Sequence, residues 1–160
     1  QVGVEGVRLK WPNDILHEGD KLGGILLEMV GDATGTCQVV IGVGINVAMP
    51  GTAGQAIDQR WTDLARIADG QTPSRNALLA ALLDQLLPLA AGFESTGFAP
   101  WQEPWSELDA FAGTSVILHS GDHRQGGVCR GVDNRGALQL ETTTGIQKIY
   151  GGEISLRPAL

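Results

Sequence analysis

The stretch KWPNDILHEGDKLGGILLE, residues 10–28, decides how the first half of this chain folds. Pro12 cannot donate a backbone hydrogen bond, so it ends the strand that we predict over residues 7–11. The polar sequence Glu18-Gly19-Asp20 predicts a turn between strands at residues 15–17 and 21–30. Lysines, an asparagine and a Gly-Gly pair also interrupt this apolar stretch, and a plain hairpin needs none of them.

The remaining β segments fall into two regions. A strand predicted over residues 37–47 extends the first three into an antiparallel meander. The composition then changes after residue 112. From residue 113 onward, about five short apolar segments alternate with turn residues, which predicts a small closed or nearly closed barrel. We therefore divide the chain into residues 1–112 and residues 113–160.

Helices are predicted between these two regions, over residues 63–68, 77–93 and 98–111. Thr62 is the expected cap of the first helix, and Ser74 or Asn76 is the expected cap of the second. Leucines at a spacing of four residues predict a broad face of the second helix that packs into the core. Pro88 should kink this helix or divide it in two.

The composition excludes several classes of protein. The chain carries 18 acidic and 11 basic residues, a net charge of −7, and it lacks the basic stripe of a nucleic-acid-binding protein. Its two cysteines, Cys37 and Cys129, form no metal-binding pattern and are expected to be buried free thiols. No apolar run approaches the length of a membrane span. We expect a cytoplasmic protein without a protein-held metal.

Three short patterns carry candidate chemistry. In Lys10-Trp11-Pro12-Asn13-Asp14, the proline stiffens the chain, so the segment is either a rigid strand exit or a mount for Lys10 and Asn13 in a cleft. In the second interpretation, Asp14 orients these side chains or helps to hold a metal–phosphate group. The pattern alone leaves both interpretations open.

The second pattern places Lys21 beside Gly23 and Gly24. Glycines inside a strand mark a bulge or the close approach of a ligand to the backbone. A lysine beside bare backbone can bind a phosphate or a carboxylate, although most lysines at turns are simply solvated. The third pattern, Gly42 to Asn46, lacks the third glycine and the helix of a dinucleotide-binding loop. It forms either a flat slot ending in the Asn46 amide or a strand packed closely against a helix.

Taken together, KWPND at residues 10–14, KLGGIL at 21–26 and GVGIN at 42–46 resemble the biotin–protein ligases. The later segments RGVDNRGALQLE and GGEISLR resemble the small C-terminal domain of the bacterial members. The resemblance covers essentially all 160 residues. Lipoate–protein ligases share the Asn-Asp pair and the lysine but not the whole combination.

The resemblance implies an α+β fold, in which residues 1–112 form the C-terminal part of a class II synthetase-like catalytic domain and residues 113–160 form an SH3-like barrel. The implied reaction has two steps: biotin and ATP, with Mg²⁺, form biotinyl-5′-AMP, and a lysine of a biotin carboxyl carrier domain of acetyl-CoA carboxylase or a similar carboxylase then takes the biotin.

The resemblance implies roles for the residues of this sequence that match the motifs of the family. Lys21 is the implied catalytic residue at the biotin carboxylate and α-phosphate. The implied substrate-binding residues are Lys10, Trp11, Asn13, Asp14, Gly23, Gly24, Gly44 and Asn46. Glu153 and Arg157 match barrel residues that face the catalytic domain on the ATP side.

One departure from the family limits these expectations. The Gly- and Arg-rich loop that covers the adenylate lies N-terminal to KWPND in the family and is absent from this sequence, so we expect that a segment precedes Gln1 and that this chain alone ligates little or nothing. A non-catalytic binding or assembly module and a lipoate–protein ligase remain alternatives. A homodimer is plausible by analogy with the family.

Overall fold

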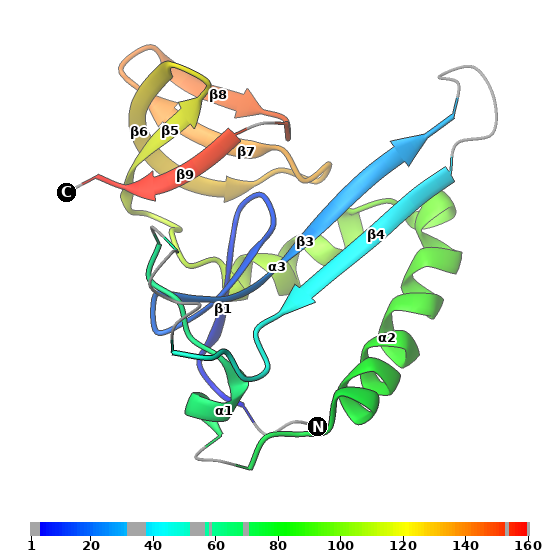
Figure 1. Cartoon of the computed structure of the whole chain (residues 1–160). Helices are drawn as coiled ribbons and strands as arrows, with labels where there is room; N and C mark the ends of the chain where they lie inside the picture. The colour runs from blue at the N-terminus through cyan, green and yellow to red at the C-terminus, as the bar shows by residue number, and fades with distance from the viewer. Residues whose placement is uncertain are drawn as a thin grey trace.

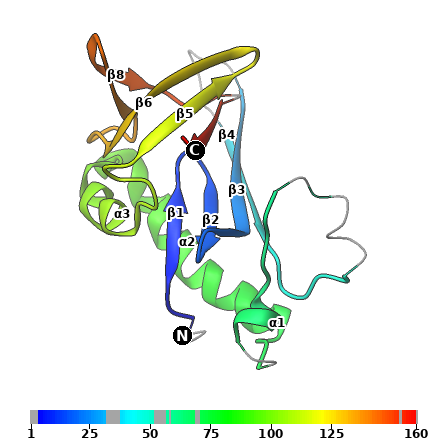
Figure 2. The ribbon, with the colours of Figure 1, turned by 90° about the vertical axis from the view of Figure 1, so that its left-hand side faces the viewer.

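The protein, described by a computed structural model, contains two antiparallel β-sheets and a few helices, which confirms the α+β class. The structure describes residues 4–31, 38–51, 57, 59–68, 71–152 and 154–159. Figure 1 shows the C-terminal sheet beside one end of the N-terminal sheet, while β3 and β4 extend away from it. The view turned by 90° shows the same arrangement, with α2 running past the N-terminal sheet (Figure 2).

The N-terminal sheet is the predicted meander, with the strand order β1-β2-β3-β4. Its strands are β1 (Val7–Lys10), β2 (Asp14–His17), β3 (Asp20–Val30) and β4 (Gln38–Ile45). The first three agree with the predicted strands to within one residue. Residue 37 lies outside the described residues, so the expectation of a buried thiol there has no structural counterpart.

The register of this sheet aligns four residues in one row. Lys10 is opposite Asp14, Asp14 is opposite Gly24, and Gly24 is opposite Gly44. Residues that lie directly opposite one another in an antiparallel sheet present their side chains on the same face. The row therefore places a lysine, a carboxylate and two glycines without side chains next to one another on one surface.

The helices differ in detail from the prediction. Helix α1 (Leu64–Ile67) is capped by Asp63 rather than Thr62, because the Asp63 side chain accepts a hydrogen bond from the Arg66 amide. Helix α2 (Arg75–Thr96) is capped by Ser74, as expected, and continues through Pro88 without dividing. The segment predicted at residues 98–111 is a 3₁₀ turn, η2 (Ala99–Trp101), followed by α3 (Gln102–Leu108).

The prediction that α2 buries a leucine face is wrong for this structure. None of its residues is buried, and Leu79, Leu83 and Leu87 are exposed. The physical reason is that no described segment packs extensively against this helix. By length and composition α2 is apolar enough to cross a membrane, so the expectation that no apolar run approaches a membrane span is also wrong. The core helix of a large soluble domain meets the same criterion.

The C-terminal unit is a five-stranded antiparallel sheet in the order β8-β7-β6-β5-β9. Its strands are β5 (Ser115–Ser120), β6 (His123–Val132), β7 (Leu138–Thr142), β8 (Gly145–Ile149) and β9 (Ile154–Pro158). Leu138 and Leu140 alternate with polar residues and are fully buried, as the period-two pattern predicts. Cys129, a buried free thiol, belongs to the same core.

The two sheets meet at a junction near Trp11. This side chain is 5% exposed and belongs to the hydrophobic cluster of the C-terminal unit. A backbone hydrogen bond from the Ala110 amide to the Leu9 carbonyl, 2.8 Å long, ties the end of the helical region to β1. The N-terminal sheet and the C-terminal unit therefore share buried contacts.

Replacing Leu138 by alanine should lower the free energy of unfolding by about 2–5 kcal/mol, because it opens a cavity in the cluster that also holds Trp11. Urea denaturation followed by far-UV circular dichroism measures this loss. Ile146→Ala on the neighbouring strand is the control, since Ile146 is 59% exposed and its truncation should cost little. Equal losses for the two variants would contradict the assignment of the core.

Candidate functional site

The carboxylate of Asp14 lies between two ammonium groups. Lys10 Nζ is 2.5 Å from Asp14 Oδ2, and Lys21 Nζ is 2.5 Å from Asp14 Oδ1. The side chains of Asp14 and Lys10 are 10% and 12% exposed, whereas that of Lys21 is 36% exposed. Lys21 therefore combines a fixed position with access to solvent, and its ammonium group has three N–H donors to share with an incoming anion.

The charge state of Asp14 follows from its neighbours. Burial raises the pKa of this carboxyl, but the hydrogen bonds and positive charges of Lys10 and Lys21 outweigh burial and hold the pKa below its usual value. Asp14 is consequently ionised at neutral pH. The three side chains together carry one net positive charge, which suits the binding of a phosphate or a carboxylate.

The glycines beside this cluster serve two different purposes. A side chain at Gly23 would collide with the backbone carbonyl of Gly44, so Gly23 permits β3 and β4 to pair. A Cβ atom at Gly24 would lie 3.3 Å from the Asn13 carbonyl oxygen and 3.6 Å from both Asp14 Oδ1 and Lys21 Cε. Gly24 therefore keeps the surface beside the charged cluster free. Of the two, Gly24 fits the expected role of leaving room for a ligand.

A shallow hollow of about 450 Å³ lies over this surface. Asn13, Asp14, Lys21, Gly24 and Gly44 contribute to its lining. The structure thus brings together most of the residues that the sequence predicted for one pocket, from the β1–β2 turn and from β2, β3 and β4.

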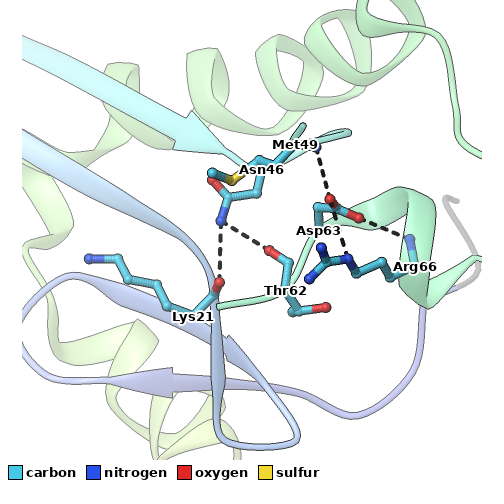
Figure 3. Close-up of polar contacts among 6 residues, drawn as sticks. All are labelled: Lys21, Asn46, Met49, Thr62, Asp63 and Arg66. Carbon is cyan, nitrogen blue, oxygen red and sulfur yellow. Dashed lines mark hydrogen bonds and ion pairs between the residues drawn. The ribbon is translucent and has the colours of Figure 1, made fainter. Parts of the chain in front are cut away.

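Asn46 supports Lys21 rather than lining the hollow. Its Nδ2 donates to the Lys21 carbonyl at 3.3 Å and to the Thr62 carbonyl at 3.0 Å, as Figure 3 shows. Backbone hydrogen bonds from the Lys21 amide to the Arg60 carbonyl and from the Thr62 amide to the Lys21 carbonyl complete this arrangement. The Lys21 side chain extends away from Asn46, so the amide fixes the backbone from which the lysine projects.

Sequence reasoning missed Asp63 as a member of this support. Asp63 is 2% exposed, and its carboxylate accepts hydrogen bonds from the Met49 amide at 2.8 Å and the Arg66 amide at 3.0 Å (Figure 3). It thereby joins the segment after β4 to the start of α1. The signal was present, because aspartate is among the strongest helix-capping residues and it directly precedes an apolar segment.

A second cavity, of about 650 Å³, lies between the β1–β2 hairpin and the C-terminal unit. Four of the eleven basic residues line it: Arg8, Lys10, Arg60 and Arg157. Lys10 connects the two hollows, because its ion-pair partner Asp14 lines the first. Arg157 thus lies in the same cavity as Lys10, on the side of the C-terminal unit that faces the N-terminal sheet, whereas residue 153 falls outside the described residues.

One expected site residue has a different position. Trp11 is buried in the C-terminal cluster rather than displayed in either hollow. Among the described residues, no group of three or more histidines, cysteines, aspartates or glutamates could hold a metal ion.

Two family models match this chain. The "Biotin/lipoate A/B protein ligase family" matches residues 4–46, which hold the charged cluster, and the "Biotin protein ligase C terminal domain" matches residues 113–157. The α+β fold and these two matches therefore place the chain in the class of biotin and lipoate protein ligases, with a small β unit at its C-terminal end.

Similarity to individual proteins agrees with these matches. The chain is 41% identical to the bifunctional ligase/repressor BirA of Escherichia coli over 99% of its length and 49% of the relative. It is 32% identical to the biotin–[acetyl-CoA-carboxylase] ligase of Paracoccus denitrificans, over 91% of this chain and 61% of the relative. The crystal structure of the Aquifex aeolicus biotin protein ligase superposes with a TM-score of 0.80 at 28% identity, over 96% of this chain and 65% of that one.

This chain belongs to the biotin protein ligase family. It spans about half the length of the curated relatives it matches. The comparisons assign no role to an individual residue, so the roles of Lys21 and its neighbours stay predictions.

Exchanging Asp14 for asparagine should lower the free energy of unfolding at neutral pH by about 1–3 kcal/mol, because two lysines lose their charged acceptor. The folded-state pKa of Asp14 is lowered, so its stabilisation is fully present above the unfolded-state pKa of about 3.9 and is lost as the pH falls through the folded-state value. Denaturant titrations from pH 7 to pH 2.5 should show the difference between the two proteins shrinking below about pH 4. A difference that stays constant over this range would refute the assignment.

The two neighbouring glycines should respond differently to substitution by alanine. Gly23→Ala forces a methyl group into the Gly44 carbonyl and should cost about 1–3 kcal/mol of stability. Gly24→Ala places the methyl group against the solvent-facing cluster and should cost less. Thermal denaturation of both variants measures the contrast. A larger loss for Gly24→Ala would mean that Gly24, and not Gly23, is the glycine that the pairing of the strands requires.

Proposed function

We propose that this chain forms the charged half of the catalytic site in a biotin–protein ligase. The observation that carries the proposal is the Lys21 ammonium group, held by Asp14 beside the bare backbone of Gly24 and Gly44. Its support is the family membership and the solved Aquifex aeolicus relative, which is described in complex with biotin and ATP.

In the first step, a carboxylate oxygen of biotin attacks the α-phosphorus of ATP, and the bond to the bridging oxygen of pyrophosphate breaks. Negative charge accumulates on the phosphate oxygens as this happens. Lys21 stabilises this charge with N–H donors that do not contact Asp14, and the ion pair fixes its position before the substrate arrives. The same ammonium group neutralises the biotin carboxylate during binding.

The nucleotide lies on the side of Lys10 and Asn13. Lys10 joins the hollow over Gly24 to the cationic cavity, where Arg157 offers a further positive charge to the phosphates. Mg²⁺ held by the triphosphate would neutralise part of its charge. Asp14 is already paired with two lysines, so the described residues fit a metal held mainly by the nucleotide.

In the second step, the amine of a carrier-protein lysine attacks the acyl carbon of the adenylate. The bond from this carbon to the AMP oxygen breaks, AMP leaves, and the nitrogen loses a proton to form the amide. A biotin carboxyl carrier domain is the proposed acceptor, and the name of the Paracoccus denitrificans relative, a biotin–[acetyl-CoA-carboxylase] ligase, supports this choice.

Because the chain spans about half the length of its relatives, the activity belongs in this proposal to the full-length protein. A cytoplasmic location agrees with the buried free thiol of Cys129. A homodimer through the N-terminal sheet agrees with β4, whose outer edge no described strand covers.

Replacing Lys21 by alanine in the full-length protein should reduce the rate of biotinyl-5′-AMP formation about 10²- to 10³-fold, because a donor to the developing charge is lost. Pyrophosphate release in the presence of biotin and ATP measures the rate. Arg130→Ala is the matched control, since Arg130 makes an exposed ion pair with Glu141 in the C-terminal unit. Unchanged adenylation in Lys21→Ala would remove Lys21 from the mechanism.

Substrate competition separates the proposal from its alternatives. Biotin should compete effectively with lipoate for adenylation by the full-length protein. Preference for lipoate would make the protein a lipoate–protein ligase. Calorimetry that detects neither biotin nor ATP binding would favour a non-catalytic assembly module.

A further inference from the structure

Trp11 connects the charged site to the C-terminal unit. It lies between Lys10 and Asn13 in sequence, yet it is only 5% exposed and belongs to the buried cluster that includes Val116, Leu138 and Leu156. Its Nε1 donates a hydrogen bond of 3.1 Å to the Gly136 carbonyl, 125 residues away along the chain. A ring buried in this way cannot stack on a substrate.

The residues on either side of Trp11 carry the polar groups of the site. Lys10 ends β1 and Asp14 begins β2, and these two residues are partners across the hairpin. Residues 11–13 form the turn between them. The Asn13 carbonyl in turn accepts a hydrogen bond of 2.8 Å from the Ile25 amide of β3. Anchoring Trp11 therefore sets the position of this turn relative to the sheet.

The acceptor of the indole hydrogen bond is itself held in place. Gly136 lies in a turn with φ +80°, a conformation that suits glycine. Asp133 Oδ1 accepts from the Arg135 amide at 2.9 Å and the Ala137 amide at 3.1 Å, and Lys148 Nζ lies 2.8 Å from Asp133 Oδ2. The ring of Phe98 lies beside Gly136, 3.6 Å from the place that a Cβ atom would take. The turn thus offers the indole a well-fixed acceptor.

We propose that Trp11 is a positioning residue through which the C-terminal unit holds Lys10, Asn13 and Asp14 in the geometry that binds the nucleotide. The proposal rests on the proposed function and adds the means by which the C-terminal unit contributes to it. It also reassigns Trp11 from a substrate contact, as the family resemblance implied, to a contact between the two parts of the protein.

The first test replaces Trp11 by phenylalanine in the full-length protein, which keeps an aromatic ring and removes the Nε1 donor. Loss of one hydrogen bond should raise the KM for ATP about two- to tenfold, while the KM for biotin changes less. Trp105→Phe is the matched control, because Trp105 packs against the same cluster but lies outside the turn between β1 and β2. Equal KM values for ATP in Trp11→Phe and the wild type would overturn the proposal.

The second test reaches the same contact from the C-terminal unit. Asp133→Ala loosens the turn that presents Gly136 without altering any residue proposed to touch a substrate. It should also raise the KM for ATP, and the double variant with Trp11→Phe should be no worse than the more severe single variant. Effects of the two substitutions that multiply in the double variant would show that they act independently, and the proposal would fail.

A measurement without catalysis separates this inference from the proposed function. The Ile25 amide donates to the Asn13 carbonyl, so its hydrogen exchange reports where the turn lies. Exchange at Ile25 should accelerate in Trp11→Phe and remain unchanged in Trp105→Phe. If the wild type makes no adenylate, the proposed function fails; if Ile25 exchanges equally in both variants, the positioning role fails.

Discussion

The carboxylate of Asp14, shared by two lysines, is the interaction on which the site depends. Lys10 and Lys21 come from different strands, and mutual repulsion would separate their ammonium groups without an anion between them. The low exposure of Asp14 strengthens both attractions, because little water competes for the charge. One acidic side chain thus fixes two cations at the edge of a hollow, and one of them remains accessible to solvent.

Backbone interactions make this ion cluster a fixed feature rather than a chance surface contact. Gly23 permits the close pairing of β3 and β4, and Gly24 leaves the space beside the cluster empty. Asn46 and the segment that follows β4 hold the backbone of Lys21 from the other side. At the opposite end, Trp11 is buried in the C-terminal unit. The polar side chains of the site therefore project from a backbone that is held in place on two sides.

Away from the charged site, much of the surface is apolar and exposed. Apolar side chains on the outer halves of β3 and β4 are exposed, among them Leu27 and Met29, and so are Leu79, Leu83 and Leu87 of α2. An apolar surface of this extent is unusual for a protein that functions in isolation and typically marks an interface. The parts of the structure in which side chains are buried and held by contacts are the charged site and the small β core, not the long helix.

The sequence by itself determined the meander, the small C-terminal β unit and the identity of the charged residues. These features follow from local rules: alternation along strands, turn residues between them, and lysines beside glycines that no hairpin requires. The sequence also indicated Asn46, Gly23 and Gly24 as site residues, but it did not distinguish the role of each one.

Tertiary structure alone decided the rest, because the deciding contacts join residues that are distant in sequence. The register across four strands placed Asp14 between two lysines and separated the role of Gly23 from that of Gly24. Periodicity placed the leucines of α2 on one face but did not reveal whether another layer covers them. The position of Trp11 depends on a core formed by distant residues and on the Gly136 carbonyl, 125 residues away, so no local pattern could show that a tryptophan in the charged motif packs into the C-terminal unit.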